Sequence, residues 1–122
     1  NEVLKLVGNS NTDIIFKYDY GKNEGYSYIS ESVEEILGYK SERFYKDPNF
    51  FTSLIHPEDI KKIAVTKKAF LKQIKKNNQT ILRYINKSGE TVWLETFLST
   101  IKNKKGEIIG ISGISRNITK QK

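Results

Sequence analysis

Alternating apolar and polar positions in the C-terminal third of the chain predict three antiparallel strands. Thr80–Ile85 and Thr91–Ile101 are rich in β-branched and aromatic residues, and a Ser-Gly turn signal at Ser88 separates them. Such a pattern is typical of a β-hairpin. A second turn signal, Asn103–Gly106, leads into a third run over Ile108–Ile118. We therefore expect a three-stranded antiparallel meander.

Two shorter apolar runs near the N-terminus predict a second hairpin. Asp13–Tyr18 and Tyr26–Ile29 read as strands, and the Gly, Asn and Asp residues between them are typical of a turn. Ahead of this hairpin, Val3 and Val7 fall on one face of a helix. We therefore predict a helical flank over residues 1–11.

The middle of the chain combines short helix signals with one long helix signal. Proline and capping patterns predict three short helices between residues 32 and 54, the first opened by a capping box of Ser32 and Glu35 and ended at Gly38. Pro57 suits a first helical position, and the two acids after it favour the positive end of a helix dipole. The long helix is therefore predicted from Pro57 to Lys76, with an apolar stripe of Ile60, Ile63, Ala64, Phe70, Leu71 and Ile74.

This order of elements indicates an α+β fold that can enclose a small pocket. A chain of 122 residues suits one domain with one core. The sequence contains no Gly-rich phosphate loop, no metal-ligand spacing and no nucleophile paired with a base. We therefore expect a binding or regulatory domain, not an enzyme by itself.

Composition excludes several kinds of chemistry. The chain has no Cys, which rules out disulfides, thiolate metal sites and a cysteine-linked chromophore. It also lacks Met, which suggests a fragment of a longer protein. No apolar run approaches the roughly 18 residues that a membrane span needs, so a cytoplasmic location is expected. The net charge of +7 includes only three arginines among 21 basic residues, and no recognition motif accompanies it. Nucleic-acid binding is therefore disfavoured.

Five motifs in order resemble those of a PAS domain of the subgroup common in bacterial and archaeal sensor proteins. The resemblance covers about Thr12 to Lys122. The motifs are Tyr28–Tyr39, the His-Pro-acid-Asp run His56–Asp59, Arg83 with the Lys87–Gly89 turn and Trp93, the last strand Ile109–Arg116, and the exit Asn117–Thr119. Ser88 and Asn117 each replace the family's usual Asp. The resemblance implies that the exit Asp pairs with a basic group while a signal passes onward. Because Asn can hydrogen-bond but cannot form an ion pair, weaker coupling is expected at Asn117.

The resemblance implies a PAS-like, five-stranded antiparallel sheet with several short helices and one long helix on one face. It places the PAS domain at residues 12–118 and the start of an exit helix or linker at 119–122. It further implies a sensory input module of a larger signalling protein, with a sensor histidine kinase preferred. The alternatives are the PAS module of a diguanylate cyclase, or a protein-interaction and dimerisation module that senses nothing.

Candidate pocket residues come from the strands and the long-helix stripe. Each is first expected in the core, because buried aromatic and aliphatic residues are mostly structural. If a cavity exists, its walls are expected to be Phe16, Ile63, Phe70, Ile74, Trp93, Phe97 and Ile111. Their apolar character predicts either a small apolar ligand or a collapsed, empty interior.

The resemblance also bears on cofactors. Haem-binding relatives use a His within the long helix, where this chain has Lys and apolar residues, so haem is disfavoured. His56, the single histidine, is expected to be structural. A non-covalent flavin stays open.

The ends of the chain suggest how a signal leaves the domain. We predict transmission through Arg116, Asn117 and Thr119, with Thr119 as the N-cap of a continuing helix. The apolar N-terminal flank could pack beside a second copy, so a homodimer is expected, with a downstream effector domain in the same parent chain.

Overall fold

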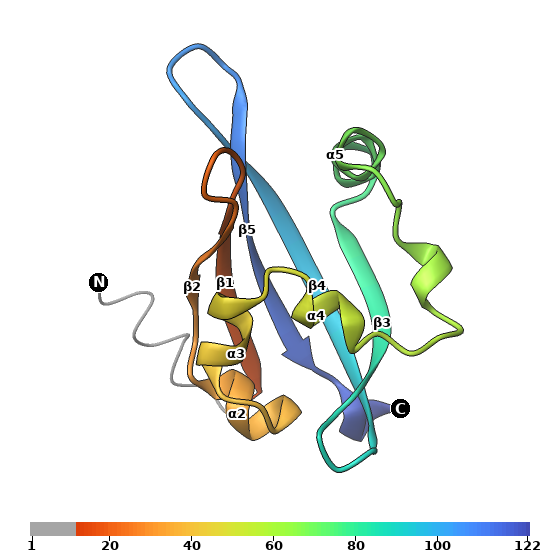
Figure 1. Cartoon of the computed structure of the whole chain (residues 1–122). Coiled ribbons are helices and arrows are strands. Elements are labelled where there is room, and N and C mark those ends of the chain that lie inside the picture. Colours follow the sequence, from red (N-terminus) through yellow and green to blue (C-terminus); the bar gives the residue numbers. More distant parts are fainter. Residues whose placement is uncertain (1–11) are drawn as a thin grey trace.

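A five-stranded antiparallel sheet forms the centre of the computed structural model, which describes residues 12–122 (Figure 1). The spatial order of the strands is β2-β1-β5-β4-β3, so the first and last strands of the chain pair at the middle of the sheet. This arrangement confirms the predicted α+β, PAS-like fold class. The strands are β1 (Asp13–Asp19), β2 (Gly25–Ile29), β3 (Gln79–Ile85), β4 (Thr91–Lys102) and β5 (Ile108–Asn117).

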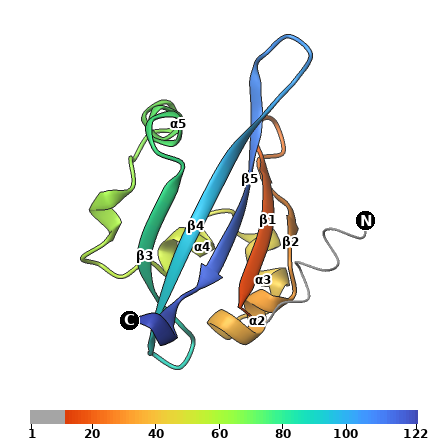
Figure 2. The same ribbon diagram turned by 180° about the vertical axis from the view of Figure 1, so that it is seen from behind.

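Helical segments between β2 and β3 lie on one face of this sheet. Turning the molecule by 180° brings the other face to the front, where the strands are uncovered except at the lower end, where the C-terminal 3-10 turn lies against β4 (Figure 2). The segments are α2 (Ser32–Leu37), α3 (Ser41–Lys46), α4 (Phe50–Ser53), the 3-10 turn η1 (Ile60–Lys62) and α5 (Lys67–Lys76), and a last 3-10 turn, η2 (Thr119–Gln121), follows β5.

The predicted long helix is wrong in its first half. In place of a helix from Pro57, the chain forms η1, becomes extended at Ile63 and starts α5 only at Lys67. The Thr66 side chain caps α5 by accepting a hydrogen bond from the Ala69 amide at 3.2 Å. Gln73 holds the bend, because its side chain bonds both the Lys62 carbonyl and the Ala64 amide. Lys67, which interrupts the expected apolar stripe between Ala64 and Phe70, is the first residue of α5.

The predicted capping box at α2 is also absent. Ser32 lies inside the helix, and its hydroxyl donates to the Asp13 carbonyl at 2.5 Å and bonds Ser30 at 2.8 Å. A tertiary contact thus replaces the local cap. The predicted stop at Gly38 is confirmed by its φ of 86°, a conformation that favours glycine. The predicted helical flank falls on residues 1–11, outside the described residues.

Hairpin register decides which side chains of β4 face the helices. The β3–β4 turn pairs Ile85 with Thr91 and Arg83 with Trp93. Since side chains alternate along a strand, Trp93 and Arg83 share one face and the residues between share the other. The core set from these strands is buried on the helix side and comprises Leu82, Tyr84, Val92, Leu94 and Leu98.

Candidate ligand cavity and its link to the C-terminal turn

A cavity of about 500 Å³ lies between the sheet and the segment that leads into α5. Ile60, Ile63 and Phe70 form part of its wall on the helical side. The strands supply the opposite wall through Phe16, Leu82, Thr96, Leu98, Ile111 and Ser115. The volume is within the range of small-molecule sites in proteins, roughly 300–1,000 Å³.

Four of the seven predicted wall residues line this cavity, namely Phe16, Ile63, Phe70 and Ile111. Ile74 lies in the hydrophobic core beside it and is not part of the lining. The prediction was wrong for Trp93 and Phe97, because their strand positions point away from the helices. A sequence signal for this was available, since Glu95 lies between them on the same face of β4.

Sequence analysis missed the polar groups of the cavity. Thr96 and Ser115 are buried side by side on β4 and β5, and their hydroxyl oxygens are 2.6 Å apart. Tyr26 and Tyr84 also line the cavity. The signal that could have identified Thr96 is its position in the alternation of buried residues between Leu94 and Leu98.

Aromatic rings form the wall of the cavity under α4. Phe51 is 5% exposed, and its ring centroid lies 5.9 Å from that of Phe16, 5.4 Å from Tyr84 and 6.3 Å from Tyr26. The pairs with Phe16 and Tyr84 are edge-to-face, and such pairs add to the energy of apolar burial. Phe51 thus connects rings from both edges of the sheet.

Two exposed charged residues belong to the rim of the cavity. Lys67, at the start of α5, places its ammonium 4.1 Å from the ring centroid of Tyr20. Glu24 accepts a hydrogen bond from the Tyr18 hydroxyl at 2.8 Å. Burial, followed by the hydrogen bond to Glu24, raises the pKa of Tyr18 above its ordinary value. The Lys67–Tyr20 contact thus joins the β1–β2 end of the sheet to α5, while the Glu24–Tyr18 hydrogen bond stays within the β1–β2 hairpin.

A buried ion pair anchors the segment that enters the cavity wall. Asp59, which precedes Ile60, is fully buried and accepts three hydrogen bonds from Arg83: from its amide at 2.8 Å, from Nε at 3.1 Å and from Nη2 at 2.7 Å. The hydrogen bond from the Arg83 side chain holds the pKa of Asp59 well below its usual range, against the opposing effect of burial. His56 fixes the same turn, since its amide donates to the Arg83 carbonyl at 2.8 Å.

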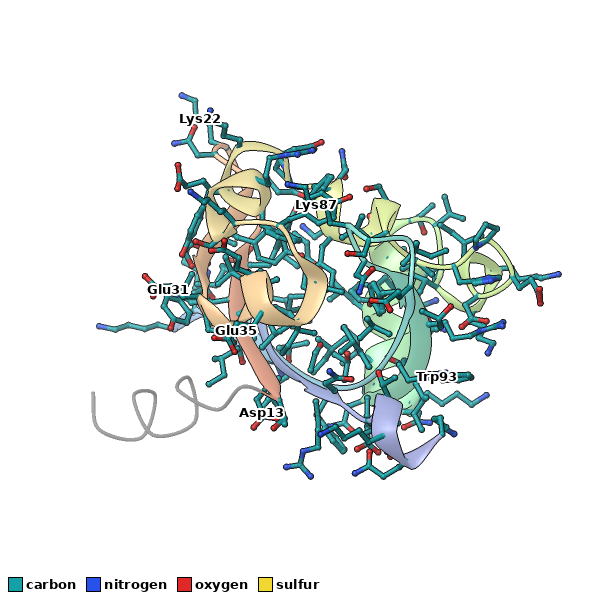
Figure 3. All side chains as sticks on the ribbon, turned by 90° about the horizontal axis from the view of Figure 1, so that it is seen from below. Asp13, Lys22, Glu31, Glu35, Lys87 and Trp93 are labelled. Carbon is teal, nitrogen blue, oxygen red and sulfur yellow. The ribbon has the colours of Figure 1, made fainter. Side chains whose placement is uncertain are left out.

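Arg83 also contacts Trp93 on the outer face of the sheet. Its guanidinium carbon lies 5.5 Å from the Trp93 ring centroid, and the Lys122 ammonium lies 5.0 Å from that ring. The Trp93 backbone continues the connection, because its amide donates to the Thr119 hydroxyl at 3.0 Å and its carbonyl accepts from Ile118 at 2.9 Å. In Figure 3, Trp93 lies near the C-terminal turn.

The three predicted transmission residues lie at this end of the sheet. Arg116 places Nε 3.6 Å from the Asp13 carboxylate, and the pair joins β5 to β1. Asn117 accepts hydrogen bonds from the Thr119 amide at 3.1 Å and its hydroxyl at 2.5 Å. The expected role of Thr119 as N-cap is therefore wrong. The Asn117 side-chain oxygen accepts from the Thr119 amide, and the Thr119 hydroxyl accepts from the Trp93 amide.

Other kinds of site have little support in the described part of the chain. No group of three or more His, Asp and Glu residues is placed to hold a metal ion there. The His56 ring nitrogen Nδ1 accepts a hydrogen bond from the Glu58 amide at 3.1 Å, which is a local turn contact. Among residues 12–122, no helix has the length and apolarity to cross a membrane.

Comparison with known proteins assigns the class. Residues 26–115 match the family described as PAS fold. The chain therefore belongs to this family, whose members are sensory and regulatory modules of signalling proteins and are generally not catalytic themselves. The methyl sulfide methyltransferase-associated sensor of Methanosarcina acetivorans is 29% identical over 119 residues, which is 98% of this chain and 12% of that protein.

Solved structures share the fold at low sequence identity. The N-terminal domain of a diguanylate cyclase with PAS/PAC sensor from Marinobacter aquaeolei is 18% identical, with a TM-score of 0.72 and coverage of 89% of this chain and 97% of that one. A sensory box histidine kinase/response regulator from Burkholderia thailandensis is 20% identical, with a TM-score of 0.65 and coverage of 98% and 84%. A light-oxygen-voltage domain studied with a flavin analogue is 12% identical, with a TM-score of 0.67 and coverage of 99% and 87%.

Proposed function

We propose that the chain is the sensory input module of a larger signalling protein, in which occupancy of the cavity changes the C-terminal turn. The observation that supports this most is the continuity of contacts between the two places. Asp59 adjoins the cavity wall, Arg83 holds Asp59, and Trp93 contacts Arg83 and bonds Thr119. A movement of the Ile60–Thr66 segment would therefore change the contacts of Thr119 through this series of residues.

A two-state equilibrium is sufficient for this mechanism. A ligand shifts such an equilibrium only if it binds one state better than the other. The segment between η1 and α5 is suited to differ between states, because it is extended and Val65 within it is fully exposed. Its attachment through Gln73 and Asp59 would transmit the difference to α5 and to β3.

We further propose a sensor histidine kinase as the parent protein. Support comes from the name of the Methanosarcina relative, a sensor, and from the shared fold with a sensory box histidine kinase. A diguanylate cyclase is the alternative parent protein, because a domain of such an enzyme shares the fold. Without Cys, a non-covalent flavin or a small apolar ligand stays open as the occupant of the cavity, and haem would lack a His ligand in α5.

A dimerisation module is a second candidate function, favoured by the outer face of the sheet. Ile81 and Phe97, whose strand positions share that face, are 36% and 38% exposed. Apolar side chains in such positions often mark contact surfaces between proteins. This proposal of a homodimer is compatible with sensing, but a module that only dimerises needs no link between the cavity and Thr119.

A cavity-filling substitution in the full-length protein tests the sensory function without a known ligand. Ala64 lines the cavity, so we expect Ala64→Phe to imitate occupancy and change the autophosphorylation rate of the parent kinase. Thr119→Val removes the hydroxyl that accepts from Trp93 and donates to Asn117, and it should suppress most of that change. The measurement is the autophosphorylation rate of the single and double variants.

Thr91→Val is the matched control, because Thr91 is exposed at the start of β4 and its hydroxyl makes no hydrogen bond within the described residues. It should leave the response to Ala64→Phe unchanged. An equal response in the Thr119→Val background would contradict transmission through Thr119. An unchanged rate in Ala64→Phe itself would contradict sensing and favour the dimerisation module.

A further inference from the structure

The hydroxyl of Tyr84 identifies the chemistry of a ligand for the cavity. Tyr84 is 7% exposed and lines the cavity, yet no group of the described residues forms a hydrogen bond with its hydroxyl. Every fully buried polar side-chain atom in the described chain has a hydrogen-bond partner. The unpaired hydroxyl must therefore reach open space, and the cavity supplies that space. An otherwise buried donor without a protein partner is costly unless water or a ligand bonds it.

The rest of the interior is uncharged. Thr96 and Ser115 provide a second pair of hydroxyls, and since they share one hydrogen bond, one proton and several lone pairs stay available. Phe16, Phe51, Leu98 and Ile111 surround these groups with apolar surface. The charged lining residues, Glu24 and Lys67, are exposed at the rim and already engage tyrosines.

The tyrosines themselves stay neutral at physiological pH. Burial raises the pKa of Tyr84 above its ordinary value. Burial, and then the neighbouring Tyr84 and Tyr18, raises the pKa of Tyr26. Both phenols therefore remain protonated donors. A charged ligand would lose its hydration in the cavity without gaining an opposite charge, which is strongly unfavourable.

Resting on the proposed sensory function, we propose that the cavity binds an uncharged ring compound whose oxygen atom accepts a hydrogen bond from Tyr84. The aromatic wall around Phe51 favours a flat ring system, since edge-to-face contacts are already the packing mode there. A volume of about 500 Å³ accommodates a molecule of two fused rings with substituents.

Three probes that share one ring system separate the contribution of the ligand's oxygen atom from the effect of its charge. 2-Naphthol is neutral with an oxygen, naphthalene is neutral without one, and 2-naphthoate carries a negative charge at neutral pH. Their affinities for the 122-residue chain can be measured by NMR titration, following the methyl signals of Leu98 and Ile111 in the cavity. We expect 2-naphthol to bind at least about tenfold more tightly than 2-naphthoate, because of the charge.

Tyr84→Phe tests the hydrogen bond itself. The variant should fold as the wild type does, because the hydroxyl has no protein partner to lose. We expect its affinity for 2-naphthol to fall about fivefold, the usual effect of one hydrogen bond, and its affinity for naphthalene to stay the same. Tyr28→Phe is the matched control, since Tyr28 is exposed on β2 and lies outside the cavity lining.

Tighter binding of 2-naphthoate than of 2-naphthol would overturn the proposal, and so would an unchanged 2-naphthol affinity in Tyr84→Phe. Absence of binding by all three probes would also overturn it. These results differ from failure of the sensory function, which would appear as unchanged autophosphorylation in Ala64→Phe whatever the probes do.

Discussion

Asp59→Asn is expected to lower the free energy of unfolding by about 2–4 kcal/mol, because it removes the charge from a buried, triply hydrogen-bonded carboxylate. An amide has one acceptor oxygen, and its NH₂ group would face the Arg83 guanidinium. Urea denaturation followed by far-UV circular dichroism measures the difference. Glu58→Gln is the matched control: Glu58 also pairs with Arg83, at 3.6 Å, but its side chain is 70% exposed. It should stay within about 0.5 kcal/mol of the wild type.

The Asp59–Arg83 ion pair also predicts that the free energy of unfolding depends on pH. The folded-state pKa of Asp59 is lowered, so its stabilisation is present above the unfolded-state pKa of about 4 and is lost as the pH falls below that value. The difference in unfolding free energy between wild type and Asp59→Asn should therefore be largest near neutral pH and shrink on acidification below about pH 4. A difference that is constant across this range would contradict the assignment of the ion pair.

Phe51→Ala is expected to cost about 3–5 kcal/mol of unfolding free energy, the usual range for removing a buried phenylalanine. Phe51 is 5% exposed and contacts rings from α3, β1, β2 and β3, so little can move in to fill the space. Thermal and urea unfolding measure the loss. Because the ring is part of the cavity wall, the variant should also have a larger cavity.

Phe97→Ala is the control for Phe51→Ala, because it makes the same chemical change on the outer face. Phe97 is 38% exposed, so its removal should cost less than about 1 kcal/mol. Equal losses in the two variants would mean that Phe97 is covered in solution, as it would be in a homodimer through the outer face. Repeating the unfolding measurement at several protein concentrations would identify a homodimer, since the stability of a dimer depends on protein concentration and that of a monomer does not.

Local signals were sufficient for most elements of the fold. The Lys87–Gly89 turn and the alternating runs on either side gave β3 and β4 their positions, and Gly38 ended α2 as predicted. These features depend on residues close in sequence, which is why pattern reasoning found them. The joining of all five strands into one sheet came from the family resemblance, and their order in space was not predicted, because pairing of β1 with β5 joins segments about 100 residues apart.

Tertiary contacts explain why the predictions of the long helix and of the helix caps were wrong. The helix expected from Pro57 is interrupted because Asp59 turns its carboxylate to Arg83, which is 24 residues later in the sequence. The hydroxyls of Ser32 and Thr119 bond partners in distant strands and therefore cannot act as local caps. Trp93 and Phe97 are large aromatic residues, which favours burial, but the charge of Glu95 between them on β4 is the signal that their shared face lies outward.

The link between the cavity and the C-terminal turn can be measured directly in the isolated chain. Trp93 is the single tryptophan, so it gives one indole N–H signal in a ¹H-¹⁵N NMR spectrum. We predict that Ala64→Phe shifts this signal and the Thr119 amide signal, although Trp93 lies on the sheet face opposite the cavity. Shifts confined to the residues around the cavity, with Trp93 and Thr119 unchanged, would contradict the proposed transmission.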